Sequence, residues 1–240
     1  MSAHLSAHLA SLRAAISRLE RLPARADALP VPLAPAIDAA LPGWNGGAGG
    51  IARGAVHEVL AADPGAASGF VAMLAGRASA QVAQAPVLWL SPARAPKPYA
   101  PGLAAFGLAP AALVVVEAEA ENLLWAAEEA LRSPAPAAVI VLGTVPTLTA
   151  WRRLQLAAEA SAGLGLLLGP DQAVPRPSAA CTRWRVAAAP GGDGPAHALA
   201  PPRWRLDLLR ARGGRPASWL ADWDGAALAV PERHLNGRAA

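Results

Sequence analysis

Residues 138–168 read AVIVLGTVPTLTAWRRLQLAAEASAGLGLLL. Two short apolar runs, residues 138–142 and 164–168, enclose residues 148–161, whose apolar side chains recur at helical spacing. Each run has the length and the aliphatic composition of a buried strand. A strand, a helix and a second strand in this order indicate a βαβ unit, in which the two strands are parallel.

The same alternation extends toward the N-terminus. Residues 56–60, 86–90 and 113–116 predict three more strands, and residues 68–83 and 119–132 predict two more helices. Strands that are apolar throughout belong to sheets that are covered on both faces. The sequence therefore predicts an α/β fold with a mostly parallel, twisted sheet flanked by helices.

The pattern changes beyond residue 175. Residues 182–186 (TRWRV) and 202–206 (PRWRL) both alternate polar and apolar side chains around the triplet Arg-Trp-Arg. They predict a C-terminal antiparallel hairpin that extends the sheet, and residues 219–224 predict a last strand.

Positive charge is concentrated in the same C-terminal part. Residues 176–240 carry ten Arg against five acidic residues, whereas residues 1–175 carry ten Arg and Lys97 against twelve acidic residues. A basic C-terminal third could face a phosphate backbone or an acidic protein partner, or it could be an ordinary arginine-rich soluble surface.

These patterns divide the chain into five parts. Residues 1–22 predict an amphipathic helix, in which Leu5, Leu9, Leu12 and Ile16 form one stripe that packs on this chain's own core or on a partner. Residues 23–53 predict a linker and loop rich in Pro and Gly, residues 54–175 the core, residues 176–230 the basic sheet extension, and residues 231–240 a disordered tail.

Composition also limits where the protein works. No apolar run approaches the roughly 18 residues that a membrane helix needs, and the first twenty residues lack the apolar stretch of a secretory signal. Cys181 is the only cysteine, which excludes an intramolecular disulfide framework. We therefore expect a cytoplasmic protein without a membrane segment.

Residues 64–71 (PGAASGFV) stand between a predicted strand and a predicted helix, the position of a phosphate loop of the form G-x-x-x-x-G-K-[ST]. Pro64 replaces the first Gly, and Gly69 keeps the second. Phe70 and Val71 replace the Lys and the hydroxyl residue that hold phosphate and Mg²⁺. This window is therefore predicted to be a degenerate phosphate loop.

Two further catalytic positions are also lost. The strand at 138–142 is followed by Gly143, where an Asp would organise Mg²⁺, and the strand at 86–90 is followed by Ser91, where a Glu would polarise water. Glu128 and Glu129 are expected on a solvated helix face rather than as an acid/base pair. The sequence therefore predicts a chain that is not an enzyme and has no cofactor and no metal.

Several stretches together carry a resemblance to a known family. They are GAVHEV at 54–59, PVLWL at 86–90, YAPGL at 99–103, FGL at 106–108, LWAAEEALR at 124–132 and RWRLDLLRARGGRP at 203–216. In these stretches the chain resembles the ImuA family, RecA-like accessory proteins of bacterial damage-induced mutagenesis that are sometimes described as SulA-like. The resemblance implies a degenerate RecA-like core and a role in error-prone translesion synthesis, with association with the nucleoid when DNA is damaged.

The resemblance also implies partners. They are a Y-family-polymerase-like mutasome subunit, RecA as a further candidate and, indirectly, an alternative replicative polymerase subunit. We expect the contact residues in two groups: the N-terminal stripe (Leu5, Leu9, Leu12, Ile16) and a basic C-terminal group (Arg205, Arg210, Arg212, Arg215, Trp219, Trp223), because Arg and Trp are enriched among interface anchors.

Two other functions remain open. A SulA-like cell-division inhibitor would bind a tubulin-like division protein. A weak DNA-binding module would contact DNA through the basic C-terminal third, with an affinity that falls steeply with salt.

Overall fold

The computed structural model describes residues 29–42, 49–171, 177–191 and 201–231. The predicted N-terminal helix, with Leu5, Leu9, Leu12 and Ile16, lies outside the described residues, as does the predicted tail beyond residue 231.

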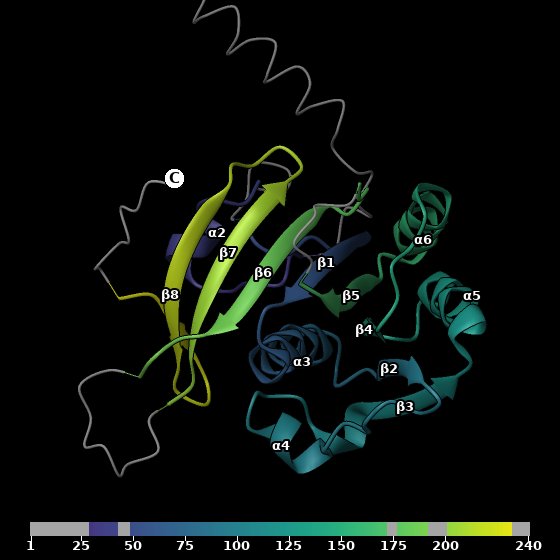
Figure 1. The fold of residues 1–240 in the computed structure, drawn as a ribbon, viewed down its shortest axis with the longest axis horizontal. Coiled ribbons are helices and arrows are strands. Elements are labelled where there is room, and N and C mark those ends of the chain that lie inside the picture. Colours follow the sequence, from purple (N-terminus) through teal and green to yellow (C-terminus); the bar gives the residue numbers. More distant parts are fainter. Residues whose placement is uncertain (1–28, 43–48, 172–176, 192–200, 232–240) are drawn as a thin grey trace, which may run out of the picture.

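Nine strands of the described chain form one sheet. They are β1 (Ala55–Ala61), β2 (Val87–Pro92), β3 (Leu113–Ala118), β4 (Ala138–Leu142), β5 (Leu164–Pro170), β6 (Thr182–Ala188), β7 (Arg203–Ala211), β8 (Ala217–Trp223) and β9 (Leu228–Ala229). Their order is β3-β2-β4-β5-β1-β6-β7-β8-β9 (Figure 1). The first six are mutually parallel, and β6 to β9 pair antiparallel. The predicted fold class is therefore confirmed.

Helices cover both faces of the parallel strands. One face carries α2 (Pro35–Asp38), α3 (Pro64–Ala80) and α4 (Ala100–Ala104), and the other carries α5 (Ala120–Arg132) and α6 (Leu148–Ser161) (Figure 1). A 3₁₀ turn, η1 (Pro110–Ala112), leads into β3. None of the helices in the described parts of the chain is long and apolar enough to cross a membrane.

Helix α3 begins four residues before the predicted start, at Pro64 rather than Ser68. The carboxylate of Asp63 caps it by accepting a hydrogen bond from the Ala66 backbone N–H at 2.7 Å. Proline is well suited to the first helical position, because it has no N–H to leave unsatisfied there. Twelve of the seventeen helix residues are buried, because α3 lies between the parallel strands and the C-terminal strands.

The predicted linker over residues 23–53 is wrong for residues 29–42 and 49–53. Val31 and Ile51 exchange two backbone hydrogen bonds of 2.8 and 2.9 Å, and both side chains are fully buried, as is Ile37 of α2. The guanidinium of Arg77 on α3 donates to the carbonyl oxygens of Pro32 and Leu33. This segment is therefore part of the main core, held by apolar residues that stand between its prolines.

The inner face of the C-terminal strands is aromatic. Trp184 of β6 and Trp204 of β7 lie with ring centroids 5.8 and 6.1 Å from Phe70 of α3. Trp219 and Trp223 of β8 complete the layer, with Trp223 stacked 6.5 Å from Trp204. These strands therefore cover α3 with a packed layer of indole rings.

A buried polar chain joins β1 to β6. His57 Nε2 lies 2.9 Å from the Ala52 carbonyl, so Nε2 carries the proton, and Nδ1 accepts from the Thr182 hydroxyl at 2.7 Å. The Thr182 oxygen in turn accepts from the Trp184 indole N–H at 2.8 Å. Burial lowers the pKa of His57 to about 4, which keeps the ring neutral.

We expect Ile37→Ala to lower the free energy of unfolding by about 3 kcal/mol, because it removes a fully buried side chain from the core. Leu29→Ala is the matched control: Leu29 is 73% exposed, and its loss should change stability by less than about 0.5 kcal/mol. Urea unfolding at pH 7 measures both. Equal small effects would mean that residues 29–42 are a linker after all.

His57 makes stability depend on pH. Its folded pKa is about 4, and its unfolded pKa is about 6.5, so the unfolded chain binds the extra proton first as pH falls. The stabilisation is complete above pH 6.5 and is lost progressively toward pH 4, by up to about 3 kcal/mol. Unfolding free energies from pH 7.5 to 4.5 should fall more steeply for the wild type than for His57→Gln, which cannot titrate. Parallel curves would contradict this assignment.

Candidate functional site

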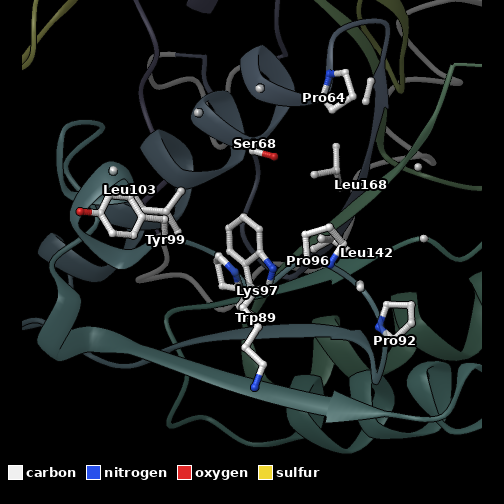
Figure 2. Close-up of a pocket in the computed structure, with 18 of the residues that line it drawn as sticks. Pro64, Ser68, Trp89, Pro92, Pro96, Lys97, Tyr99, Leu103, Leu142 and Leu168 are labelled. Carbon is white, nitrogen blue, oxygen red and sulfur yellow. The ribbon is translucent and has the colours of Figure 1, made fainter.

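A cavity of about 660 Å³ opens at the carboxyl ends of the parallel strands (Figure 2). It lies between the ends of β1, β2, β4 and β5, the first turns of α3, and the loop that joins β2 to α4. This edge is where open parallel sheets bind their ligands. The structure therefore places a cavity at the position that the sequence assigns to a degenerate phosphate loop.

The N-terminus of α3 is occupied by a carboxylate of the same chain. Residues 64–71 form its first two turns rather than a loop, and Asp63 accepts from the backbone N–H of Ala66. A helix N-terminus attracts anions through its free N–H groups and its dipole. Here a phosphate would meet the charge of Asp63, and Pro64 supplies no N–H at all.

Phe70 and Val71 do not face the cavity. Both side chains are fully buried in the main core, and Phe70 packs against the indoles of Trp184 and Trp204. Gly69 does line the cavity, and a Cβ there would come within 2.9 Å of the Phe106 ring. The positions that match the phosphate-binding Lys and hydroxyl residue therefore serve packing.

The ends of β2 and β4 bring no acid to the cavity. Gly143 follows β4 at a φ of +70°, and Pro92 ends β2 beside it. Among the described residues that line the cavity, Lys97 alone carries a charge, and its ammonium is 2.8 Å from the Glu117 carboxylate. Its side chain is 75% exposed, at the mouth of the cavity.

Apolar groups make up the rest of the wall. Five prolines line it together with aromatic and aliphatic side chains: Pro64, Pro92, Pro96, Pro98, Pro170, Trp89, Tyr99, Leu103, Phe106, Leu142 and Leu168. Trp89 lies among them in the middle of the site (Figure 2). Its indole N–H is buried and has no hydrogen-bond partner in the described part of the chain. No sequence pattern signals this, because an aromatic residue in a strand is typical of the core.

The basic C-terminal group does not form one surface. Arg205 pairs with Asp207 on the outer face of β7, whereas Arg210 and Arg212 donate to the backbone carbonyls of Ser178 and Ala179. Arg215 is exposed in the turn before β8.

Trp219 and Trp223 belong to the core, with exposed fractions of 8% and 3%. The Trp223 indole donates to the Ala105 carbonyl at 2.8 Å, and the Arg77 guanidinium lies 5.6 Å from its ring centroid. The prediction that these two indoles are surface anchors is therefore wrong. Positions 219, 221 and 223 of β8 are all buried and alternate with more exposed neighbours, which is typical of the inward face of a strand.

The outer face of the C-terminal strands pairs its charges. The pairs are Arg183–Glu58, Arg185–Asp171, Arg203–Asp222 and Arg205–Asp207. The excess of Arg in this third of the chain is therefore not an uninterrupted basic surface, since carboxylates from β1, β7, β8 and the end of β5 lie among the guanidinium groups.

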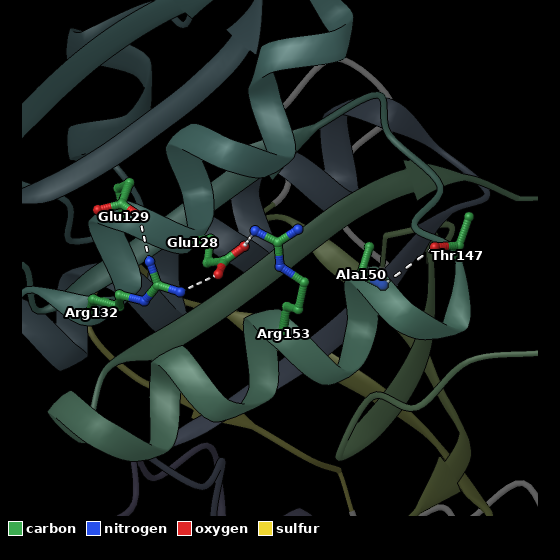
Figure 3. A network of polar contacts seen from close by, with 6 residues as sticks. All are labelled: Glu128, Glu129, Arg132, Thr147, Ala150 and Arg153. Carbon is green, nitrogen blue, oxygen red and sulfur yellow. Dashed lines mark hydrogen bonds and ion pairs between the residues drawn. The ribbon is translucent and has the colours of Figure 1, made fainter.

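A second charged cluster joins α5 to α6 (Figure 3). The Glu128 side chain is only 5% exposed, and its carboxylate contacts both Arg132 of its own helix and Arg153 of α6. Glu129 pairs with the other arm of Arg132. The expected solvated face is therefore wrong for Glu128, which holds the two helices together. The described residues contain no group of three or more His, Cys, Asp or Glu side chains placed to hold a metal ion.

The fold and the cavity define an α/β protein with a mostly parallel sheet and a largely apolar cavity at the carboxyl ends of its strands. Two proteins named "Protein ImuA", from Caulobacter vibrioides strains NA1000 / CB15N and ATCC 19089 / CIP 103742 / CB 15, are each 40% identical to this chain over 203 residues. The matched region covers 78% of this chain and 80% of each relative. The chain therefore belongs to the ImuA family. No protein-family model matches it.

Restoring the two phosphate-loop residues should not restore ATP binding. In Phe70→Lys/Val71→Thr the new ammonium would be buried under the indoles without a counter-charge, which we expect to lower the free energy of unfolding by about 4 kcal/mol. Isothermal titration calorimetry with Mg-ATP should give no binding heat for this variant or for the wild type. A well-folded variant that binds ATP would contradict the placement of these side chains.

Proposed function

We propose that this chain is a non-catalytic, RecA-like scaffold of the bacterial DNA-damage (SOS) response. It supports error-prone translesion synthesis together with a Y-family-polymerase-like partner and an alternative replicative polymerase subunit. Membership of the ImuA family supports the damage-response role.

The cavity at the carboxyl ends of the strands carries the non-catalytic part of the proposal. Triphosphate binding needs a cation, free N–H groups and a metal ligand at this edge. Asp63 caps α3, the Phe70 side chain is in the core, and Gly143 ends β4. A triphosphate here would be left with several uncompensated charges against apolar walls.

Two surfaces remain candidates for the partners. The first is the turn with Arg210, Arg212 and Arg215. Arg215 is the most accessible of the three to a partner, because the other two donate to backbone carbonyls. The second is the N-terminal stripe, which would dock on RecA or on the polymerase-like subunit. An acidic partner surface fits the first, since all three cations come from the end of β7 and the turn that follows it.

The two alternatives are less well supported. DNA binding through the outer face of the C-terminal strands would require each phosphate to displace a carboxylate already paired with Arg. A cell-division inhibitor rests on the SulA-like description alone.

The test is damage-induced mutation frequency in a strain that lacks this gene, with cell length measured in the same cultures. We expect induced mutation to fall to the uninduced level while division stays normal. Complementation with Arg210→Glu/Arg212→Glu/Arg215→Glu should fail, whereas Arg152→Glu, an exposed change on α6, should restore induction. The thermal midpoint of the purified triple variant excludes unfolding as the cause. Unchanged mutation with failed division arrest would establish the division inhibitor instead.

A further inference from the structure

The two edges of the sheet differ in how well they are protected. At one end β9 has only two residues, Leu228 and Ala229, and Pro231 follows shortly after it. At the other end β3 has six residues and pairs, among the described residues, with β2 alone (Figure 1). Natural proteins protect an edge strand by making it short, or with prolines, lysines or bulges. Strand β3 has none of these: its sequence is LVVVEA, and its register with β2 is regular.

The backbone of β3 carries hydrogen-bonding groups that face away from the sheet. The Ala118 carbonyl accepts from the Ala93 N–H at 3.1 Å, on the side of β2. Because successive residues of a strand turn their N–H and C=O groups to opposite sides, Val116 also bonds to β2. The N–H and C=O groups of Val115 and Glu117 therefore point outward, and no described residue beyond that edge pairs with them. Such groups are matched by an added strand.

The side chains at this edge are apolar, and their charges are balanced. Val114 and Val115 are 45% and 40% exposed, and they lie on opposite faces of the strand. Glu117 is the one charged residue of β3, and the Lys97 ammonium lies 2.8 Å from its carboxylate. A strand that pairs here therefore has to bring apolar, β-branched side chains rather than charges.

The edge of β3 is complementary to itself. Its outward-facing residues, Leu113, Val115 and Glu117, are spaced evenly about Val115. An antiparallel copy of β3 centred on the same residue therefore places each outward-facing residue opposite another one, as an antiparallel ladder requires. Val115 then faces Val115 of the copy, and Glu117 faces Leu113 rather than a second carboxylate, so like charges do not oppose each other. On the other face of the strand, Val114 faces Val116.

We propose that two copies of this chain pair through β3 as an antiparallel dimer, with one sheet continuous across both copies. Val115 of each copy exchanges two N–H···O bonds with Val115 of the other, and each Glu117 N–H donates to the Leu113 carbonyl of the other copy. The Leu113 N–H takes no part, because it donates to the Pro110 carbonyl of its own chain. A two-fold contact uses the same surface on both copies, so association stops at the dimer. This dimer does not depend on the proposed function.

Opposite charges at the central position test the dimer and its two-fold register. In sedimentation equilibrium the full-length chain should pass from a mass of 24.3 kDa toward twice that value as its concentration rises, with a dissociation constant of about 1–100 μM for so small an interface. Val115→Lys and Val115→Glu each place like charges opposite each other, so each should weaken the dimer at least about tenfold. An equimolar mixture of the two variants should dimerise again, because an ammonium then faces a carboxylate.

Val145→Lys is the matched control. Val145 is 42% exposed in the connection between β4 and α6, so the same change there should leave the dimer intact. Recovery of the dimer in the mixture also shows that both Val115 variants keep their fold. The inference is overturned by a wild type that stays monomeric across this concentration range, by a dimer that Val115→Lys leaves unchanged, or by a mixture that associates no more tightly than either variant alone.

Discussion

Burial of α3 on all sides is the constraint on which the rest of the structure depends. The parallel strands cover one side of this helix, and the indoles of Trp184 and Trp204 cover the other. A helix enclosed in this way must be apolar around its whole circumference, and α3 is. The Phe70 side chain is fixed in that enclosure, so the residue that replaces the phosphate-binding Lys is now required for packing.

The C-terminal strands follow from the same constraint. Their alternation puts the indoles on α3 and the guanidinium groups on the opposite face, where no helix covers them in the described part of the chain. Four Arg–carboxylate pairs then run across β1, β6, β7 and β8. Such pairs contribute little stability one by one, but they keep an arginine-rich face from presenting an unbroken positive charge. The arginine-rich composition of this third of the chain is therefore better explained by strands that cover α3 with one face and pair their charges on the other than by a site that binds polyanions.

The sequence predicts those features that neighbouring residues determine, such as helix caps and the spacing of apolar side chains. Helix α6 begins and ends at the predicted residues, because Thr147 caps it and its apolar period is regular. The sequence places the start of α3 four residues too late, because residues 64–71 occupy the position of a phosphate loop, and the cap and first-turn proline at Asp63 and Pro64 are then overlooked. The segment from Val31 to Ile37 is predicted as a linker because of its prolines, whereas its apolar residues pack into the core only in the folded chain. No sequence pattern predicts that the Trp89 indole N–H lacks a partner among the described residues, because the four strands, the helices and the loop around it meet only in the folded chain.

The absence of phosphate-loop side chains from the described strand ends and the presence of an apolar cavity there have one physical origin. Where the strand ends bind phosphate, their charged side chains stay hydrated or pair with the nucleotide. Once Asp63 caps α3 and Gly143 and Pro92 end the strands, hydrophobic walls face water there, and burying such walls is favourable at roughly 25 cal/mol per Å². In this fold, therefore, the side chains that leave the strand ends without a carboxylate also make the walls of the cavity apolar.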